Sequence, residues 1–92
     1  MPYLRQDFRD VIESQINLKW LANYFASLKF DEFVGALNYL VYTIVKQYLD
    51  RNGTSYAKLA GIVGTLKCCI SEIYRRIAGP YEDLKIHCNG DV

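Results

Sequence analysis

The stretch from Ser55 to Pro80 constrains the fold more than any other part of the chain. Its apolar residues recur every three or four positions, which is the spacing of one face of an α-helix. Gly79 and Pro80 then act as a stop signal, because glycine often caps a helix and proline cannot continue its hydrogen-bond ladder. We therefore predict a helix over about 55–78, capped at its start by Thr54 or Ser55.

Helical spacing predicts two further helices before this one. The first covers about 5–28, with Asp7 as its N-cap and Asn17 as the position of a bend. The second covers about 31–50; Asp31 caps its start, and the residues 51–53 (Arg-Asn-Gly) stop it, since asparagine and glycine readily take the left-handed conformation.

These elements predict an all-α fold in a single domain over residues 1–92, a small bundle of three main helices. The short loop after residue 50 favours an antiparallel helical hairpin over 31–78, to which the N-terminal helix adds. Residues 79–92 are expected to form an extended C-terminal arm, because residues 84–87 (Leu-Lys-Ile-His) alternate in polarity. Such an arm either folds back on its own helices or reaches across to a neighbouring subunit.

The composition favours self-association. Of 92 residues, 51% are hydrophobic, and eight tyrosines, four phenylalanines and one tryptophan are more aromatic surface than a three-helix monomer can cover. We therefore expect a homo-oligomer, whose order the sequence leaves open.

Small residues form a line of their own along the helix predicted over 55–78. They are Ala57, Gly61, Gly64 and Cys68. Because each glycine inside a helix costs about 1 kcal/mol against alanine, the line indicates a close neighbour. Tight packing against the second helix, contact with another subunit and close approach of a ligand all remain open.

Several functional classes are disfavoured. A formal net charge of +1 argues against a dedicated nucleic-acid binder. Three cysteines and one histidine form neither a disulfide framework nor a zinc site, and no metal or cofactor is expected. No stretch has the pattern of a signal peptide or membrane span, which favours a cytoplasmic protein without membrane contact.

The sequence also lacks an enzyme signature. There is no phosphate-binding glycine loop of known spacing. His87 and Cys88 are adjacent on the predicted extended arm, where neighbouring side chains point to opposite faces, so a catalytic dyad is not expected. We predict a protein that binds rather than one that catalyses.

Two groups of residues are candidates for binding. Arg75 and Arg76, flanked by Tyr74 and Tyr81 and preceded by Lys67, could hold a phosphate and stack a base. The simpler interpretation is that the two arginines interact with the negative end of the helix dipole. The second group shares the polar face of the second helix and consists of Tyr39, Tyr42 and Lys46; the simpler interpretation of its tyrosines is an interface.

The C-terminal third also carries a recognisable motif. It runs from Tyr74-Arg75-Arg76 through Pro80-Tyr81-Glu82-Asp83 to Asn89-Gly90-Asp91-Val92. With Met1-Pro2-Tyr3, Leu37-Asn38-Tyr39 and Ser55-Tyr56-Ala57 it resembles a family of small uncharacterised proteins from tailed phages and prophages. The aromatic-rich first helix departs from the usual pattern of that family.

A phage context implies three functional hypotheses. The first is a helical oligomer that sequesters a phosphorylated, nucleotide-type signal of host defence at a subunit interface, in the host cytoplasm. The alternative is a protein–protein interaction module, either an inhibitor of a host protein or an accessory virion protein, that binds through the aromatic face of the first helix. A third and weaker hypothesis is nucleic-acid binding by a multimer that aligns Arg75 and Arg76.

Overall fold

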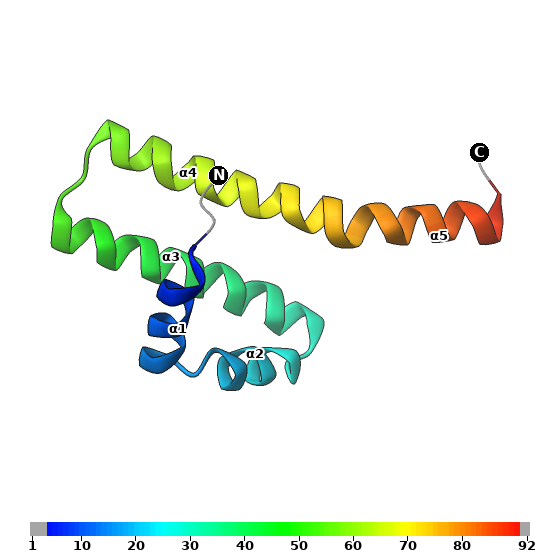
Figure 1. Ribbon diagram of the computed structural model, residues 1–92, viewed down its shortest axis with the longest axis horizontal. Helices are drawn as coiled ribbons and strands as arrows, with labels where there is room; N and C mark the ends of the chain where they lie inside the picture. The colour runs from blue at the N-terminus through cyan, green and yellow to red at the C-terminus, as the bar shows by residue number, and fades with distance from the viewer. Residues whose placement is uncertain (1–3, 91–92) are drawn as a thin grey trace. The chain divides into compact units, whose positions relative to one another are not determined.

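The computed structural model describes residues 4–90, and these are almost entirely helical (Figure 1). The elements are α1 (Gln6–Gln15), α2 (Leu18–Ala26), α3 (Phe30–Asn52), α4 (Tyr56–Ile73), the π-helical turn η1 (Tyr74–Ala78) and α5 (Gly79–Asn89). No β-strand occurs in this range, which confirms the all-α class. The chain divides into two units between Thr54 and Ser55, and each is described by itself. The hairpin expected over 31–78 spans both units and stays a prediction.

The first predicted helix is two helices. Ile16 is extended (φ −133°, ψ 132°) and separates α1 from α2, so the bend expected at Asn17 is a complete break. The Asn17 side chain accepts a hydrogen bond from the Trp20 backbone N–H at 2.9 Å and caps α2, a role for which asparagine is among the best residues. The prediction of Asp7 as the first N-cap was wrong: Arg5 holds that position, and Asp7 lies in the first turn of α1.

The predicted limits of the second helix agree with α3 to within two residues. Asp31 is not its cap, because α3 begins one residue earlier, with Lys29 as the N-cap. The Lys29 backbone N–H instead donates to the Glu32 side chain at 3.3 Å. Gly53 ends α3 as predicted; its φ of 84° lies in the left-handed region, and its N–H donates to the Leu49 carbonyl at 2.8 Å.

An aromatic contact joins α2 to α3 within the N-terminal unit. The rings of Phe25 and Phe33 meet edge to face, with centroids 6.4 Å apart. The most enclosed side chains of this unit are half-buried, and no residue between 4 and 90 is fully buried. Trp20 and Tyr24 stack with centroids 6.0 Å apart, and both remain more than half exposed.

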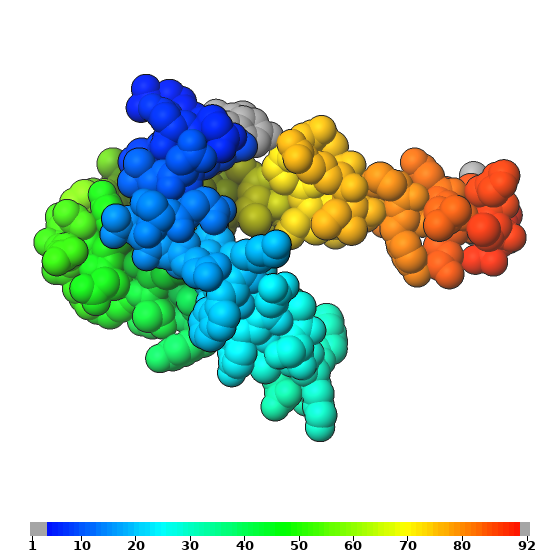
Figure 2. All heavy atoms as spheres, turned by 60° about the horizontal axis from the view of Figure 1, so that its bottom comes forward, coloured from blue at the N-terminus to red at the C-terminus, as the bar shows by residue number. Residues whose placement is uncertain are grey.

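The C-terminal unit is one continuous helix, in which α4, η1 and α5 follow without a break (Figure 1); we call it the long helix. Ser55 caps it as predicted, since its hydroxyl accepts a hydrogen bond from the Lys58 N–H at 3.2 Å. In Figure 2 the residues of α5 form a rod that is one helix thick.

The prediction that Gly79-Pro80 ends this helix in an extended arm was wrong over the described residues 79–90; residues 91 and 92 lie outside them. Gly79 is helical (φ −58°, ψ −55°), and its N–H donates to the Tyr74 carbonyl, five residues back. This wider turn offers a physical reason for continuation: it relieves the clash of the Pro80 ring with the preceding turn, so the helix continues although Pro80 donates no hydrogen bond to it. The helix stops at Gly90, whose φ is 84°.

The two glycines of the small-residue line lie on α4 and have open space around them within the C-terminal unit. A Cβ atom placed on Gly61 or Gly64 would meet no atom within 4 Å. Because α3 and α4 belong to different units, tight packing against the second helix, contact with another subunit and approach of a ligand all stay predictions.

Candidate ligand-binding site

The predicted binding residues fall into two groups that belong to different units. Tyr39, Tyr42 and Lys46 lie on α3, and we call them the tyrosine–lysine face. Lys67 lies on α4, Tyr74, Arg75 and Arg76 form most of η1, and Tyr81 lies on α5. The two groups are therefore two candidate sites, one in each unit.

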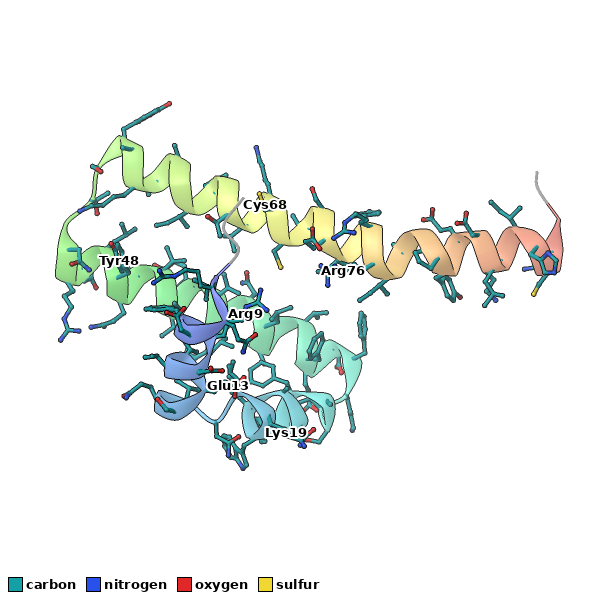
Figure 3. The ribbon with its side chains drawn as sticks, in the orientation of Figure 1. Arg9, Glu13, Lys19, Tyr48, Cys68 and Arg76 are labelled. Carbon is teal, nitrogen blue, oxygen red and sulfur yellow. The ribbon has the colours of Figure 1, made fainter. Side chains whose placement is uncertain are left out.

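A single carboxylate organises the basic group. One oxygen of Glu72, Oε2, lies 2.8 Å from Arg75 Nη2 and 2.7 Å from Arg76 Nε (Arg76 is labelled in Figure 3). These partners are three and four residues apart, which is the spacing of neighbours on a helix surface. We call Glu72, Arg75 and Arg76 the arginine cluster. Sequence reasoning missed Glu72, although the helical spacing alone could have indicated it.

The cluster combines a fixed geometry with exposed positive charge. The Glu72 side chain is 23% exposed, whereas those of Arg75 and Arg76 are 62% and 65% exposed. Two guanidinium groups and one carboxylate leave an excess of one positive charge. Because both guanidiniums bond the same oxygen, Glu72 draws the two cations to one place and also competes with any anion that binds them.

The π-helical turn places Tyr74, Arg75 and Arg76 at consecutive positions of a widened helix. Consecutive residues on a helix do not face one another, so Tyr74 projects in a different direction from each arginine. Lys67 is seven residues before Tyr74, two turns away along the same side of the helix. Turns of this kind are frequent at functional sites, although Pro80 already gives this one a structural reason.

The ring of Tyr81 contacts a lysine side chain that sequence reasoning missed. Lys85 Nζ lies 5.6 Å from the centroid of the Tyr81 ring, a cation–π arrangement across one helical turn. The pair could not be foreseen while residues 79–92 were expected to be extended. Lys85 therefore adds one more positive charge to the basic group. It also covers part of the Tyr81 ring, on which a base would stack.

The tyrosine–lysine face is exposed along α3. Tyr39 and Tyr42 are 72% and 62% exposed, and their spacing of three, with Lys46 four residues further on, keeps them on one side of the helix. Lys46 Nζ donates to Asp50 Oδ1 at 2.6 Å. This hydrogen bond and the charge of Asp50 raise the pKa of Lys46, and Tyr42 contributes in the same direction. Asp50, which sequence reasoning missed, thus engages the cation of this face.

Three further features are not found in the described residues: a metal-binding group, a membrane-spanning helix and a pairing of His87 with Cys88. No group of three or more histidine, cysteine or acidic residues is arranged to hold a metal ion between residues 4 and 90. Over the same residues no helix is both long and apolar enough to cross a membrane. His87 and Cys88 lie on α5 and not on an extended arm; as consecutive helical residues they still do not face each other.

Comparison with known proteins gives one match. A family described as "Domain of unknown function (DUF6899)" matches residues 1–92. The search of curated proteins found no match, and neither did the search of solved structures. The match spans the whole sequence, and the chain belongs to that family.

Proposed function

We propose that this member of the DUF6899 family is a non-enzymatic, oligomeric binding protein that captures a small phosphorylated ligand of the nucleotide class. The observation that carries the proposal is the arginine cluster, in which Glu72 holds two exposed guanidinium groups beside one another. Paired guanidinium groups match the oxygens of a phosphate better than isolated cations do. Tyr74 before the cluster and Tyr81 after it are the aromatic residues that we propose to stack a base, once Lys85 moves off the Tyr81 ring.

The biological role that fits such capture is sequestration. The resemblance of the C-terminal motif to proteins of tailed phages and prophages supports a protein that removes a nucleotide signal of host defence in the host cytoplasm. Sequestration needs no catalytic residues. It does need tight binding, because signals of this kind act at low concentration.

Calorimetric titration with ATP, cyclic AMP and a set of cyclic dinucleotides tests the proposal. We expect at least one nucleotide to bind with Kd below about 10 µM. The double variant Arg75→Ala/Arg76→Ala should lose this binding, and Arg51→Ala, which removes an exposed arginine of α3, should not. If every nucleotide binds more weakly than this limit, sequestration is untenable.

A second candidate function rests on the aromatic surface of α2. Trp20 is 64% exposed and stacks on Tyr24, an arrangement suited to anchoring a protein partner. This hypothesis predicts that Trp20→Ala abolishes capture of a host or virion protein from infected cells, while the double arginine variant does not. Calorimetry and capture therefore separate the two functions.

Nucleic-acid binding by an oligomer is the weakest alternative. It depends on Arg75 and Arg76 alone, and the net charge of +1 disfavours it. It requires binding that weakens steeply as salt rises, because each phosphate contact releases counterions. Affinity for a mixed-sequence duplex that does not change between low and high salt would exclude it.

A further inference from the structure

The apolar side of the long helix continues past η1 to the end of α5. Nine residues follow one another at spacings of three, four and four, a pattern that repeats every eleven positions: Leu59, Ile62, Leu66, Ile70, Ile73, Ile77, Tyr81, Leu84 and Cys88. Eleven residues complete slightly more than three turns of an α-helix, so such a repeat stays close to one side of it. The wider turn of η1 rotates the stripe somewhat round the helix, but the backbone at Tyr74 and Gly79 keeps angles close to those of an α-helix, so the rotation is small. We call these nine residues the eleven-residue stripe.

Helix lengths show that this stripe is too long for its own chain to cover with one helix. α3 has 23 residues. α4 has 18 and η1 has 5, so these two elements together are as long as α3. Even if α3 paired with the long helix along its whole length, the 11 residues of α5 would extend beyond it. Ile77, Tyr81 and Leu84 are all more than half exposed. The end of the stripe is therefore available to a partner.

We infer that this partner is a second copy of the same helix, packed antiparallel across a two-fold axis at Gly79. The apolar positions are nearly symmetric about that residue, because Ile77 and Tyr81 each lie two positions from it. An antiparallel copy places Ile77 beside Tyr81 of the second copy, and Ile70 beside Cys88 of the second copy. A surface that is complementary to itself in this way is what a two-fold dimer requires.

The charges beside the stripe are also complementary to themselves. In the same register Arg76 lies near Asp83 of the second copy, and Tyr74 lies near Lys85 of the second copy. Glu72 and His87 meet in the same way. No two like charges are brought together, and two-fold symmetry makes each of these pairs twice.

The expected interface is small. From Ile70 to Cys88 a helix spans about 28 Å, and two helices in contact over this length lie at the low end of stable interfaces. We therefore expect dissociation in the micromolar range. The pairing follows from the geometry of the long helix and holds whether or not a ligand binds, although it would place both copies of Arg76 at the same interface.

Native cysteines provide the test. In the antiparallel register Cys69 of one copy lies beside Cys88 of the other, whereas the same two residues in one chain are about 28 Å apart along a helix and cannot bond. Oxidation of the full chain with diamide at about 20 µM, a concentration chosen for a micromolar dimer, should give a covalent dimer on a non-reducing gel. Peptide mapping should identify the bond as Cys69–Cys88. Cys69→Ser and Cys88→Ser should lose the dimer, and the matched control Cys68→Ser should keep it.

Sedimentation equilibrium gives an independent readout without oxidation. Leu84→Glu places a charge in the stripe and should raise the dimer Kd at least tenfold, while the control Ile86→Glu, on another side of α5, should change it less than twofold. Circular dichroism checks that both variants stay helical. Loss of the covalent dimer in Cys68→Ser, its survival in Cys69→Ser, or equal effects of the two glutamate variants would overturn the inference. A monomer at every concentration would do the same, and none of these results depends on nucleotide binding.

Discussion

Replacing Glu72 by glutamine tests the arginine cluster most sharply, because it keeps the shape of the side chain and removes its charge. Two ion pairs, at 2.8 and 2.7 Å, are lost together. Both arginines are mostly exposed, so each pair stabilises the fold by at most about 1 kcal/mol. We expect a total loss of about 0.5–1 kcal/mol in the free energy of unfolding, which lowers Tm by roughly 2–8 °C in a chain of this size.

The same change should strengthen anion binding. In the native cluster the Glu72 carboxylate occupies both guanidinium groups and repels an incoming phosphate. Two like charges about 4 Å apart repel each other by about 1 kcal/mol in water. Removing the charge of Glu72 beside a bound phosphate should therefore raise the affinity roughly fivefold. Calorimetry with inorganic pyrophosphate measures this gain for Glu72→Gln against the native chain, and the gain should shrink as salt is raised.

A loss of pyrophosphate affinity in Glu72→Gln, in place of the expected gain, would refute the reasoning. If Glu72→Gln weakens pyrophosphate binding as much as Arg76→Ala does, the carboxylate positions the arginines and does not compete with the ligand. A control with Glu82→Gln, an exposed carboxylate of α5, shows how much of any gain comes from net charge alone. Equal gains in the two variants would mean that the contacts of Glu72 have no special role.

Three further predictions concern the helices. Pro80→Ala should raise Tm by several degrees, because an alanine supplies the missing N–H and has a higher helix propensity than proline; thermal unfolding followed by circular dichroism measures it, and a fall in Tm would contradict our account of η1. Asn17→Ala should lower stability by about 1 kcal/mol through loss of the α2 cap, as urea unfolding would show; an unchanged midpoint would mean that α2 needs no cap. Asp50→Asn should lower the pKa of Lys46, measured by NMR titration, since Asp50 raises it in the native chain. A Lys46 pKa raised on folding stabilises the fold fully below about 10.5, the usual lysine value, and this stabilisation is lost as pH rises through the folded-state pKa; an unchanged pKa in the variant would contradict the pairing.

Local signals were reliable where one residue decides the backbone. Gly53 ends α3 because a positive φ is costly for other residues, and Ser55 caps α4 because its hydroxyl satisfies a free backbone N–H. Asn17 marks a break for the same reason. These features follow from short-range chemistry, which the sequence contains in full.

Prediction failed at Gly79-Pro80, where a local stop signal did not end the helix. Gly79-Pro80 has the pattern of a stop signal, but a helix can continue past a proline where the preceding turn is widened, and η1 is such a turn. The error hid the Tyr81–Lys85 pair, whose spacing has meaning only on a helix. Glu72 was missed for a different reason: it lies outside the basic motif, and its role follows only from its spacing of three and four residues before the arginines on a helix.

The central claim is that Arg75 and Arg76 bind the phosphate of a nucleotide-class ligand. The most direct test is an NMR titration that follows the Nε–H signals of the arginine side chains while the nucleotides are added. We predict that the signals of Arg75 and Arg76 shift in a saturable way with one of them, while that of Arg51 does not move. Uniform small shifts of all arginines, or no shift at millimolar nucleotide, would contradict the claim.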